Sequence, residues 1–333
     1  MNARPKVYIS KKIPGSVLEW LQQHCDCRMW EGQTVTSRSG LLEALRDVDG
    51  LITTGGRIDA ELLDAAPRLK VVSNISVGYN NFDIEAMKAR GVIGTHTPHV
   101  LDETVADTVL ALMLSVARRV PELDRFVKEG RWKKGVGLSD EHFFGLDVHH
   151  ATAGIIGMGR IGEAIARRAV NGFGMKLLYT NRSRRPDMEE RYGAVYAPLE
   201  ELLRESDFVI LMTPLTPETT RMIRREHFAM MKPSAFFINA SRGQTVDEEA
   251  LIEALRSGTI RGAGLDVFEM EPVQPDNPLL SMDNVVTLPH IGSATEKTRL
   301  DMAMLAARNL VAVLTGSGEA YVVKELQGLT AGR

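Results

Sequence analysis

Residues 154–162 read Gly-Ile-Ile-Gly-Met-Gly-Arg-Ile-Gly, and this stretch decides the fold. Its Gly-x-Gly-x-x-Gly spacing is typical of the turn that binds a dinucleotide between a strand and a helix. Gly157 permits the tight turn, Gly159 lets the backbone approach a pyrophosphate, and Gly162 lets the helix lie close to the strand. The helix that follows would direct the free N–H groups of its N-terminus at the phosphates.

The residues on either side of this turn complete a β-α-β unit. Residues 151–156 form a short apolar run, which predicts a buried strand entering the turn. Apolar residues then recur at helical spacing from Ile161 to Ala169, and glycines at 172 and 174 end that helix. Residues 175–180 predict the next strand. These flanks favour a dinucleotide site over an ordinary glycine-rich turn.

A basic run, Asn181-Arg182-Ser183-Arg184-Arg185, follows the second strand of this unit. In an NAD site, an Asp or Glu at this place binds the ribose hydroxyls, and its charge would repel a 2′-phosphate. Asn181 carries no charge, and the arginines after it suit a phosphate through bidentate hydrogen bonds. A solvated basic loop is the structural alternative. The run predicts a preference for NADPH over NADH.

The composition is that of an ordinary soluble globular protein. The chain has 333 residues, which suggests about two domains, and it is 44% apolar and 25% charged. A net charge of −3 gives no reason to expect nucleic acid or an anionic membrane as a partner. The longest apolar stretch, residues 109–117, is too short to span a bilayer, and residues 1–13 lack the apolar core of a signal peptide.

The two cysteines, Cys25 and Cys27, are separated by one residue. This spacing matches neither a redox Cys-x-x-Cys pair nor a zinc site. We therefore expect reduced thiols and a cytoplasmic location.

Strand and helix signals alternate along the chain, which predicts parallel sheets flanked by helices. In the first part, strands are expected at residues 7–9, 50–53, 69–73 and 91–94, and helices at 16–24, 59–66 and 83–90. A long helix is expected at 102–119, with Pro121 just beyond it, followed by an irregular arm over 130–147.

Later strands are near-continuous apolar runs at residues 207–211, 235–239, 262–266 and 284–287, as buried parallel strands should be. A last helix is expected at 296–314. The pattern predicts an α/β protein with two Rossmann-like domains. A dinucleotide-binding domain, residues 102–293, is inserted into a substrate domain, residues 1–101 and 294–333.

Three polar residues follow predicted strands of the second domain: Arg242, Glu271 and His290. In doubly wound folds, ligands bind beyond the carboxyl ends of the strands, so these are candidate catalytic residues. Taken singly, each has a structural alternative, such as a core histidine, a capping group or a surface ion pair. Together, and in a chain with a cofactor turn, they favour an active site.

Four ordered motifs resemble those of the D-isomer-specific 2-hydroxyacid dehydrogenases. They lie at residues 154–162, 239–243, 264–272 and 289–294, and the resemblance covers nearly the whole chain. Residues 144–150, Phe-Gly-Leu-Asp-Val-His-His, resemble in particular the bacterial glyoxylate/hydroxypyruvate reductases, also called 2-ketogluconate reductases. The chain departs from the family at 149–152, where members often have Gly-Lys-Thr-Leu and this chain has His-His-Ala-Thr.

The resemblance implies a role for each candidate catalytic residue. Arg242 would hold the carboxylate of a 2-oxo acid and polarise its carbonyl, a task suited to a planar fork of N–H donors. His290 would be the general acid that protonates the carbonyl oxygen as hydride arrives. Glu271 would bond the other imidazole nitrogen, orient the ring and favour the imidazolium form.

The resemblance also implies the binding residues. Ser76, Val77 and Gly78 match the family's substrate loop, and Arg242 and His290 would contact the substrate too. The expected cofactor residues are Thr104, Gly157, Met158, Gly159, Arg160, Ile161, Gly162, Asn181, Arg182, Ser183, Thr213, Pro214, Ala240, Ser241, Asp266 and Gly292. No metal is expected, because His96 and His99 lack an obvious third ligand and are interpreted as loop residues.

The sequence thus predicts an NAD(P)-dependent oxidoreductase that acts on CH–OH donors and prefers NADP. We expect NADPH-dependent reduction of small 2-oxo acids (glyoxylate, hydroxypyruvate, 2-keto-D-gluconate) to D-2-hydroxy acids. Two alternatives stay open: another D-2-hydroxyacid dehydrogenase, such as one acting on 3-phosphoglycerate, and a non-catalytic NAD(P)-sensing scaffold of the corepressor type. The family commonly dimerises through the long helix and the arm after it, so a homodimer is expected.

Overall fold

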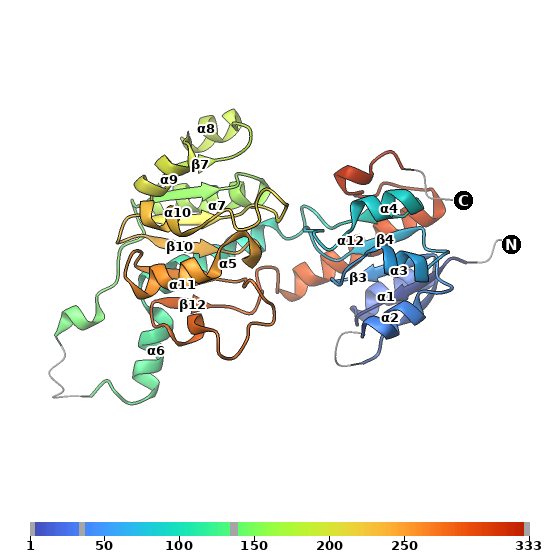
Figure 1. Ribbon diagram of the computed structural model, residues 1–333, viewed down its shortest axis with the longest axis horizontal. Coiled ribbons are helices and arrows are strands. Elements are labelled where there is room, and N and C mark those ends of the chain that lie inside the picture. The colour runs from blue at the N-terminus through green and yellow to red at the C-terminus, as the bar shows by residue number, and fades with distance from the viewer. Residues whose placement is uncertain (1–3, 33–36, 134–138, 330–333) are drawn as a thin grey trace. The chain divides into compact units, whose positions relative to one another are not determined.

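The computed structural model describes residues 4–32, 37–133 and 139–329, and it divides into two compact units (Figure 1). Unit 1 is formed by Met1–Leu101 with Ala294–Arg333, and unit 2 by Asp102–Ser293. Along the chain, unit 2 is therefore inserted into unit 1. Each unit contains a parallel sheet flanked by helices, so the predicted α/β class with two parallel sheets is confirmed.

Unit 1 contains a five-stranded parallel sheet in the order β2-β1-β3-β4-β5. Its strands are β1 (Lys6–Ile9), β2 (Asp26–Met29), β3 (Gly50–Thr53), β4 (Val71–Asn74) and β5 (Ile93–Thr95). Its helices are α1 (Gly15–Gln22), α2 (Arg38–Ala44), α3 (Ala60–Ala65), α4 (Ile84–Arg90) and α12 (Glu296–Thr315), with a 3-10 turn at Lys324–Leu326. The inner strands β3 and β4 are buried along their whole length, as their apolar sequences predict.

The last helix, α12, belongs to unit 1 although it follows unit 2 in sequence. It packs against α1, β3 and β4. Two buried polar groups attach it: Ser73 donates a hydrogen bond to the Ala306 carbonyl at 2.7 Å, and the Asn309 amide donates to the His96 carbonyl at 2.8 Å. These bonds satisfy polar groups that would otherwise be buried without partners.

Unit 2 contains a seven-stranded parallel sheet in the order β12-β11-β10-β9-β6-β7-β8. Its strands are β6 (Thr152–Ile156), β7 (Lys176–Thr180), β8 (Val195–Tyr196), β9 (Phe208–Leu211), β10 (Phe236–Asn239), β11 (Gly262–Leu265) and β12 (Val285–Thr287). Its helices are α5 (Asp102–Ala117), α6 (Val120–Lys128), α7 (Arg160–Phe173), α8 (Pro186–Tyr192), α9 (Leu199–Glu205), α10 (Arg225–Met230) and α11 (Glu248–Arg256). Short 3-10 turns lie at Asp140–Phe143, Gly243–Thr245 and Pro278–Ser281.

The central strands of unit 2 are apolar throughout because both faces of this sheet are covered. In β9, Phe208 and Ile210 belong to the core shared with α5 and α7, whereas Val209 and Leu211 belong to the core shared with α9, α10 and α11. Successive side chains of a strand point to opposite faces, so a sheet covered on both sides needs an unbroken apolar run.

The strand order of unit 2 reverses next to β6. The chain runs from β6 through β7 to β8 on one side and then returns to place β9 on the other side of β6. In open α/β sheets, ligands bind beyond the carboxyl ends of the strands at such a reversal. The glycine-rich turn begins at the carboxyl end of β6, at this point.

Eight strands and α-helices of the described residues were not predicted: β2, β8, α2, α6, α8, α9, α10 and α11. Two of them show why. The strand β2 lies at the edge of its sheet with every second residue exposed, and its charged Asp26 and Arg28 hide the strand signal. The helix α6 begins at Val120 immediately after Arg119, whose left-handed backbone (φ 56°) ends the preceding helix. Pro121 therefore opens a new helix instead of only ending the long one. The expected irregular arm lies partly outside the described residues.

The long helix α5 is buried within unit 2. Leu110, Leu112 and Met113 lie inside the core formed with α7 and the sheet, and Leu114 is half-buried. The apolar side chains of α5 are therefore covered largely within the unit. No helix of the described residues is long and apolar enough to cross a membrane.

One glycine of unit 2 allows two segments of backbone to pass in contact. A Cβ added at Gly243, directly after Arg242, would lie 1.8 Å from the carbonyl carbon of Phe268 and 2.4 Å from the nitrogen of Glu269. Backbone atoms cannot rotate away as a flexible side chain can. Any side chain at this position must therefore separate the turn after β10 from the turn after β11.

We predict that Gly243→Ala lowers the free energy of unfolding by about 3 kcal/mol, because the methyl group forces the two backbone segments apart. Gly172→Ala is the matched control, since position 172 lies in α7 with no atom near the added Cβ. Alanine there should stabilise the protein by about 0.5–1 kcal/mol through helix propensity. Chemical denaturation of the two variants measures both effects, and equal stabilities would contradict the close approach at Gly243.

Candidate active site and cofactor turn

The glycine-rich turn has the geometry that its sequence predicts. Gly157 has a left-handed backbone (φ 105°), and a Cβ there would lie 2.8 Å from the carbonyl of Met212. A Cβ at Gly162 would lie 2.6 Å from the Gly157 carbonyl oxygen. By contrast, a Cβ at Gly159 would meet no other atom within 4 Å. Two glycines are therefore required by the packing of the protein, and Gly159 borders open space.

This open space fits a dinucleotide. Gly159 is the N-cap residue of α7, and no side chain caps the helix. The free N–H groups of the first turn are thus available to phosphate oxygens, whose charge is favoured at a helix N-terminus. Arg160 and Ile161 belong to this first turn, and Met158 is fully buried between two glycines.

The basic run divides into residues with and without acidic partners. Arg184 forms an ion pair with Glu189 at 2.7 Å, and Arg185 forms one with Asp187 at 2.7 Å. Arg182 is exposed and forms no hydrogen bond or ion pair with any residue that the structure describes.

Asn181 and Ser183 shape the turn that follows β7. The side-chain amide of Asn181 donates to the Ser183 carbonyl at 3.2 Å. Asn181, the residue directly after β7, carries no carboxylate, whereas an NAD site would place an Asp or Glu there.

His290 and Glu271 lie together, as predicted. Nδ1 of His290 is 2.7 Å from Oε2 of Glu271, and the two side chains are 46% and 34% exposed. Nε2 of His290 forms no hydrogen bond with any described residue, so it can face a substrate. His290 also has a left-handed backbone (φ 54°), a conformation that is uncommon outside glycine and often occurs at functional sites.

Asp266 at the end of β11 holds the His290 segment in place. Its carboxylate accepts hydrogen bonds from the backbone N–H groups of Ile291 at 2.7 Å and Gly292 at 2.8 Å. The His290 N–H donates to the Asp266 carbonyl oxygen at 2.9 Å. Asp266 is 1% exposed, and this burial raises the pKa of its carboxyl group, although the two backbone donors oppose the shift. A contact with nicotinamide stays a prediction for this residue.

Glu271 is held by two donors. Besides the imidazole, the backbone N–H of Phe268 donates to its Oε1 at 3.1 Å. Partial burial works against ionisation of this carboxyl group, but the hydrogen bond and charge of His290, the Phe268 N–H and the charge of Arg242 outweigh it. Together they place the pKa of Glu271 below its ordinary value. The carboxylate therefore stays ionised beside the imidazole at neutral pH.

Arg242 follows β10 and is also fixed by its backbone. Its carbonyl accepts from the buried Asn239 amide at 3.2 Å and from the Thr245 hydroxyl at 2.6 Å, and its guanidinium donates to the Ser241 carbonyl at 2.7 Å. Burial lowers the pKa of Arg242, and the charge of Glu271 opposes that shift. A guanidinium has so high an ordinary pKa that it remains a cation.

The other predicted cofactor residues of unit 2 also follow its strands. Thr213 and Pro214 come after β9, Ala240 and Ser241 come after β10, and Thr104 lies in the first turn of α5. Ser241 is buried, and both its hydroxyl and its N–H donate to the Asn239 side chain. Their contacts with a cofactor stay predictions.

The predicted substrate loop, Ser76–Val77–Gly78, lies in unit 1 after β4. The buried Asn74 amide donates to the Ser76 hydroxyl at 2.9 Å and to the Gly78 carbonyl at 3.0 Å. An imidazole nitrogen of His96 lies 2.9 Å from the Val77 carbonyl. The backbone N–H groups of Ser76, Val77 and Gly78 form no hydrogen bond with the described residues, and their contact with a substrate stays a prediction.

Sequence reasoning missed the supporting residues Asn74 and Asn239. Each is the last residue of a buried strand, and each amide holds the loop that follows. The signal was present, because a polar residue ends an apolar run in both cases. The described residues hold no cluster of three or more His, Cys, Asp or Glu side chains that could bind a metal.

Comparison with known proteins identifies the family. Residues 110–292 match the model of the D-isomer specific 2-hydroxyacid dehydrogenase NAD binding domain. This is the segment that contains the glycine-rich turn, Arg242, Glu271 and His290. The chain belongs to the D-isomer specific 2-hydroxyacid dehydrogenase family. It is therefore an NAD(P)-dependent oxidoreductase, as predicted.

Individual members of this family are similar over nearly the whole chain. The glyoxylate reductase of Thermococcus onnurineus is 53% identical over 315 residues, 94% of each chain. The glyoxylate/hydroxypyruvate reductase B of Yersinia pestis is 51% identical over 314 residues, 94% of this chain and 95% of that one. The crystal structure of an NADPH-dependent glyoxylate/hydroxypyruvate reductase from Sinorhizobium meliloti, in complex with NADP and malonate, has a TM-score of 0.85. It is 37% identical and covers 99% of both chains.

We predict that Glu271 titrates below the ordinary glutamate pKa of about 4.3. Any stabilisation from the ionised carboxylate is then fully present above that value and is lost as the pH falls through the lowered pKa. In His290→Ala the pKa of Glu271 should rise, because burial acts without the opposing imidazole. Carboxyl chemical shifts measured by NMR against pH test this directly. His149→Ala, which changes an exposed histidine outside the site, should leave the titration unchanged.

Proposed function

We propose that this protein reduces small 2-oxo acids to D-2-hydroxy acids with NADPH. Glyoxylate, hydroxypyruvate and 2-keto-D-gluconate are the proposed substrates. The observation that carries the proposal is the 2.7 Å pair of His290 and Glu271, in the same unit as the glycine-rich turn. The names of the relatives from Thermococcus onnurineus and Yersinia pestis support the first two substrates.

The proposed reaction needs a proton donor, and His290 supplies it. NADPH, when bound, supplies a hydride to the carbonyl carbon of the substrate. The imidazolium of His290 gives its proton from Nε2 to the carbonyl oxygen, which becomes the hydroxyl group. Glu271 accepts the hydrogen bond from Nδ1, so the ring keeps the orientation that presents Nε2. The ionised carboxylate also stabilises the charged ring before transfer.

Arg242 binds the substrate in this proposal. Its guanidinium can donate two parallel hydrogen bonds to a carboxylate, which fixes the plane of a 2-oxo acid. Positioning of this kind contributes as much to rate as the proton transfer does, because it holds the carbonyl carbon where hydride can reach it. Ser76, Val77 and Gly78 are proposed to bind the same carboxylate through their N–H groups.

Preference for NADPH is proposed from the turn after β7. A 2′-phosphate needs cationic or neutral donors and no nearby free carboxylate. Asp187 and Glu189, which follow the basic run, are each paired with an arginine. Arg182 forms no ion pair with the described residues, and its charge helps to lower the pKa of the nearby Glu218 carboxyl group. The NADP complex of the Sinorhizobium meliloti relative supports this preference.

The proposal is tested by following NADPH and NADH oxidation with a panel of 2-oxo acids. We expect turnover with glyoxylate and hydroxypyruvate, and a higher kcat/KM with NADPH than with NADH. Preference for 3-phosphohydroxypyruvate would favour a 3-phosphoglycerate dehydrogenase instead. Cofactor binding without turnover on any 2-oxo acid would favour the non-catalytic scaffold.

His290→Ala should lower kcat for glyoxylate reduction by about 10²–10⁴-fold, the usual contribution of a general acid. Binding of NADPH should change little, because the proposed cofactor contacts are retained. The control is His149→Ala, for which kcat should equal that of the wild type. Unchanged turnover in His290→Ala would reject the assigned role.

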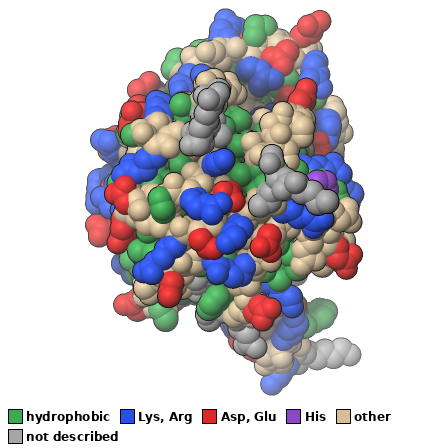
Figure 2. Space-filling view, turned by 90° about the vertical axis from the view of Figure 1, so that its right-hand side faces the viewer, with side chains coloured by type: hydrophobic (Ala, Val, Ile, Leu, Met, Phe, Trp, Pro, Cys, Tyr) green, Lys and Arg blue, Asp and Glu red, His purple; other side chains and the backbone are tan. Residues whose placement is uncertain are grey.

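We also propose that the protein is a homodimer that associates through α6 and the residues after it. Four large apolar side chains in this region are more than half exposed: Val120, Val127, Trp132 and Phe144. Clusters of exposed apolar residues on a folded domain mark contact surfaces. Charged side chains of both signs mix on the face shown in Figure 2.

Light scattering should give twice the mass of one chain. The double change Val127→Glu and Trp132→Glu should shift the protein toward monomer, because charges are costly to bury in an apolar contact. Tyr321→Glu, at an exposed aromatic residue of unit 1, is the control and should leave the mass unchanged. A wild-type monomer would contradict the proposal.

A further inference from the structure

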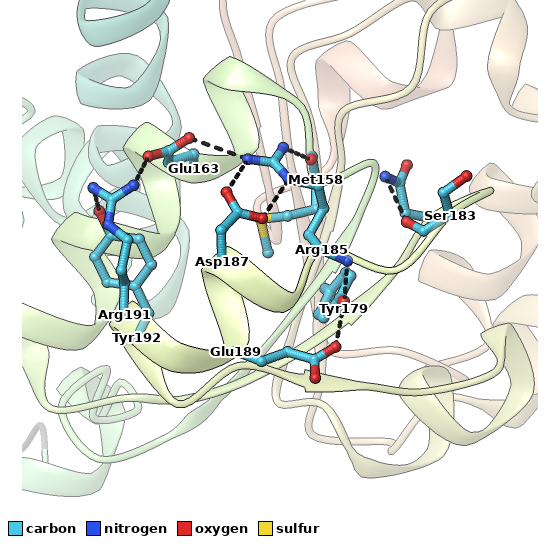
Figure 3. A network of polar contacts seen from close by, with 10 residues as sticks. Met158, Glu163, Tyr179, Ser183, Arg185, Asp187, Glu189, Arg191 and Tyr192 are labelled. Carbon is cyan, nitrogen blue, oxygen red and sulfur yellow. Dashed lines mark hydrogen bonds and ion pairs between the residues drawn. The ribbon is translucent and has the colours of Figure 1, made fainter.

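Arg185 joins the basic run to the glycine-rich turn (Figure 3). Its Nη1 donates a hydrogen bond to the Met158 carbonyl at 2.9 Å. Met158 lies between Gly157 and Gly159, and its side chain is fully buried, so it cannot move without the turn. The guanidinium of Arg185 therefore holds the part of the turn where a pyrophosphate is expected.

The same guanidinium is held by two carboxylates. Asp187 accepts from Nε at 2.9 Å and from Nη2 at 2.7 Å, which is a bidentate pair. Glu163, in the first turn of α7, lies 3.5 Å from Nη2. Asp187 and Glu163 thus fix the orientation of the Arg185 guanidinium, and its Nη1 points at the glycine-rich turn.

The backbone of Arg185 is fixed as well. Its N–H donates to the hydroxyl of Tyr179 at 2.7 Å, and that hydroxyl donates to Glu189 at 2.7 Å. Tyr179 is fully buried in β7, and Glu189 also binds Arg184. Arg184 and Arg185 therefore each form a bidentate ion pair within the protein, with Glu189 and Asp187 respectively.

We infer that Arg185 is a positioning residue that sets the glycine-rich turn relative to the basic run, and that Arg182 alone among the three arginines contacts the 2′-phosphate. This inference rests on the proposed use of NADPH. The two arginines then have different functions. Arg182 recognises the 2′-phosphate, and Arg185 shapes the turn that binds the pyrophosphate, which both dinucleotides contain.

The two roles have different consequences for the two cofactors. The glycine-rich turn serves the pyrophosphate, which NADPH and NADH both contain. Loss of a residue that positions this turn weakens the binding of both. The 2′-phosphate occurs only in NADPH, so loss of its ligand weakens NADPH binding and leaves NADH binding unchanged.

The experiment compares Arg185→Met with Arg182→Met by titrating each cofactor and following its fluorescence. Methionine keeps an unbranched apolar stem and removes every donor. For Arg185→Met we expect the Kd of NADPH and the Kd of NADH each to rise about tenfold, which is the scale of one lost charge-assisted hydrogen bond. For Arg182→Met we expect about a tenfold rise for NADPH and less than a twofold change for NADH.

Arg191→Met is the matched control. Arg191 also pairs with Glu163, at 2.6 Å, but among the described residues its guanidinium contacts only Glu163 and Tyr192, and it does not contact the turn. Both Kd values should stay within twofold of the wild type. Arg185→Lys is the conservative variant; a single ammonium can reach the Met158 carbonyl but cannot also hold Asp187 bidentately. It should give an intermediate rise for both cofactors.

A kinetic readout separates positioning from catalysis. In Arg185→Met, KM for both cofactors should rise while kcat at saturating cofactor stays within twofold, because His290 is untouched. Thermal unfolding of each variant verifies that the fold is retained; Arg185 is partly exposed, so the variant should fold.

Three results would overturn the inference. A rise in Kd for NADPH alone in Arg185→Met would make Arg185 a phosphate ligand. Unchanged Kd values for both cofactors in Arg185→Met would show that Arg185 does not position the turn. If Arg191→Met raised the two Kd values as much as Arg185→Met does, the effect would come from the loss of a partner of Glu163. The failure of the proposed NADPH preference can be told apart from the failure of this inference. Equal Kd values for NADPH and NADH in the wild type would refute the preference. A rise of both Kd values in Arg185→Met would still support the positioning role of Arg185.

Discussion

Parallel pairing of the central strands of unit 2 is the constraint on which its site depends. The last residues of the strands pair in one line across the sheet: Ile156 with Leu211, Leu211 with Asn239, Asn239 with Leu265, and Leu265 with Thr287. Because the strands all run the same way and end at the same level, the segments that follow them leave the sheet at one edge. The glycine-rich turn, Arg242, Glu271 and His290 come from four such segments.

This edge is held by buried polar groups rather than by apolar packing. Asn239 binds the Arg242 and Ser241 backbones, and Asp266 binds the backbone around His290. A buried donor or acceptor is costly to leave unpaired, so each of these side chains fixes the loop that satisfies it. The partly exposed side chains of His290 and Glu271 thus lie on rigid backbone supports.

Charge at the cofactor turn is distributed in a way that composition alone hides. Residues 181–192 contain four arginines, and three of them form ion pairs: Arg184 with Glu189, Arg185 with Asp187, and Arg191 with Glu163. Most of the basic charge is therefore neutralised locally. Arg182 forms no ion pair with the described residues, although its charge acts on the Glu218 carboxyl group. A count of arginines therefore overestimates the number that can meet a phosphate, and only side-chain directions tell them apart.

The sequence by itself determined the α/β class, the strand-turn-helix around Gly157 and the three catalytic candidates, because each rests on local pattern: apolar period, glycine spacing and a polar residue after a strand. It did not reveal β2, whose edge position makes it half polar, or α6, which starts at a proline that also ends the helix before it. The family resemblance already implied that Glu271 meets His290. Only the tertiary structure decided that the Asp266 carboxylate holds the backbone around His290 and that Arg185 faces Met158. Those facts depend on which side chains face one another across elements distant in sequence, and no local pattern carries that information.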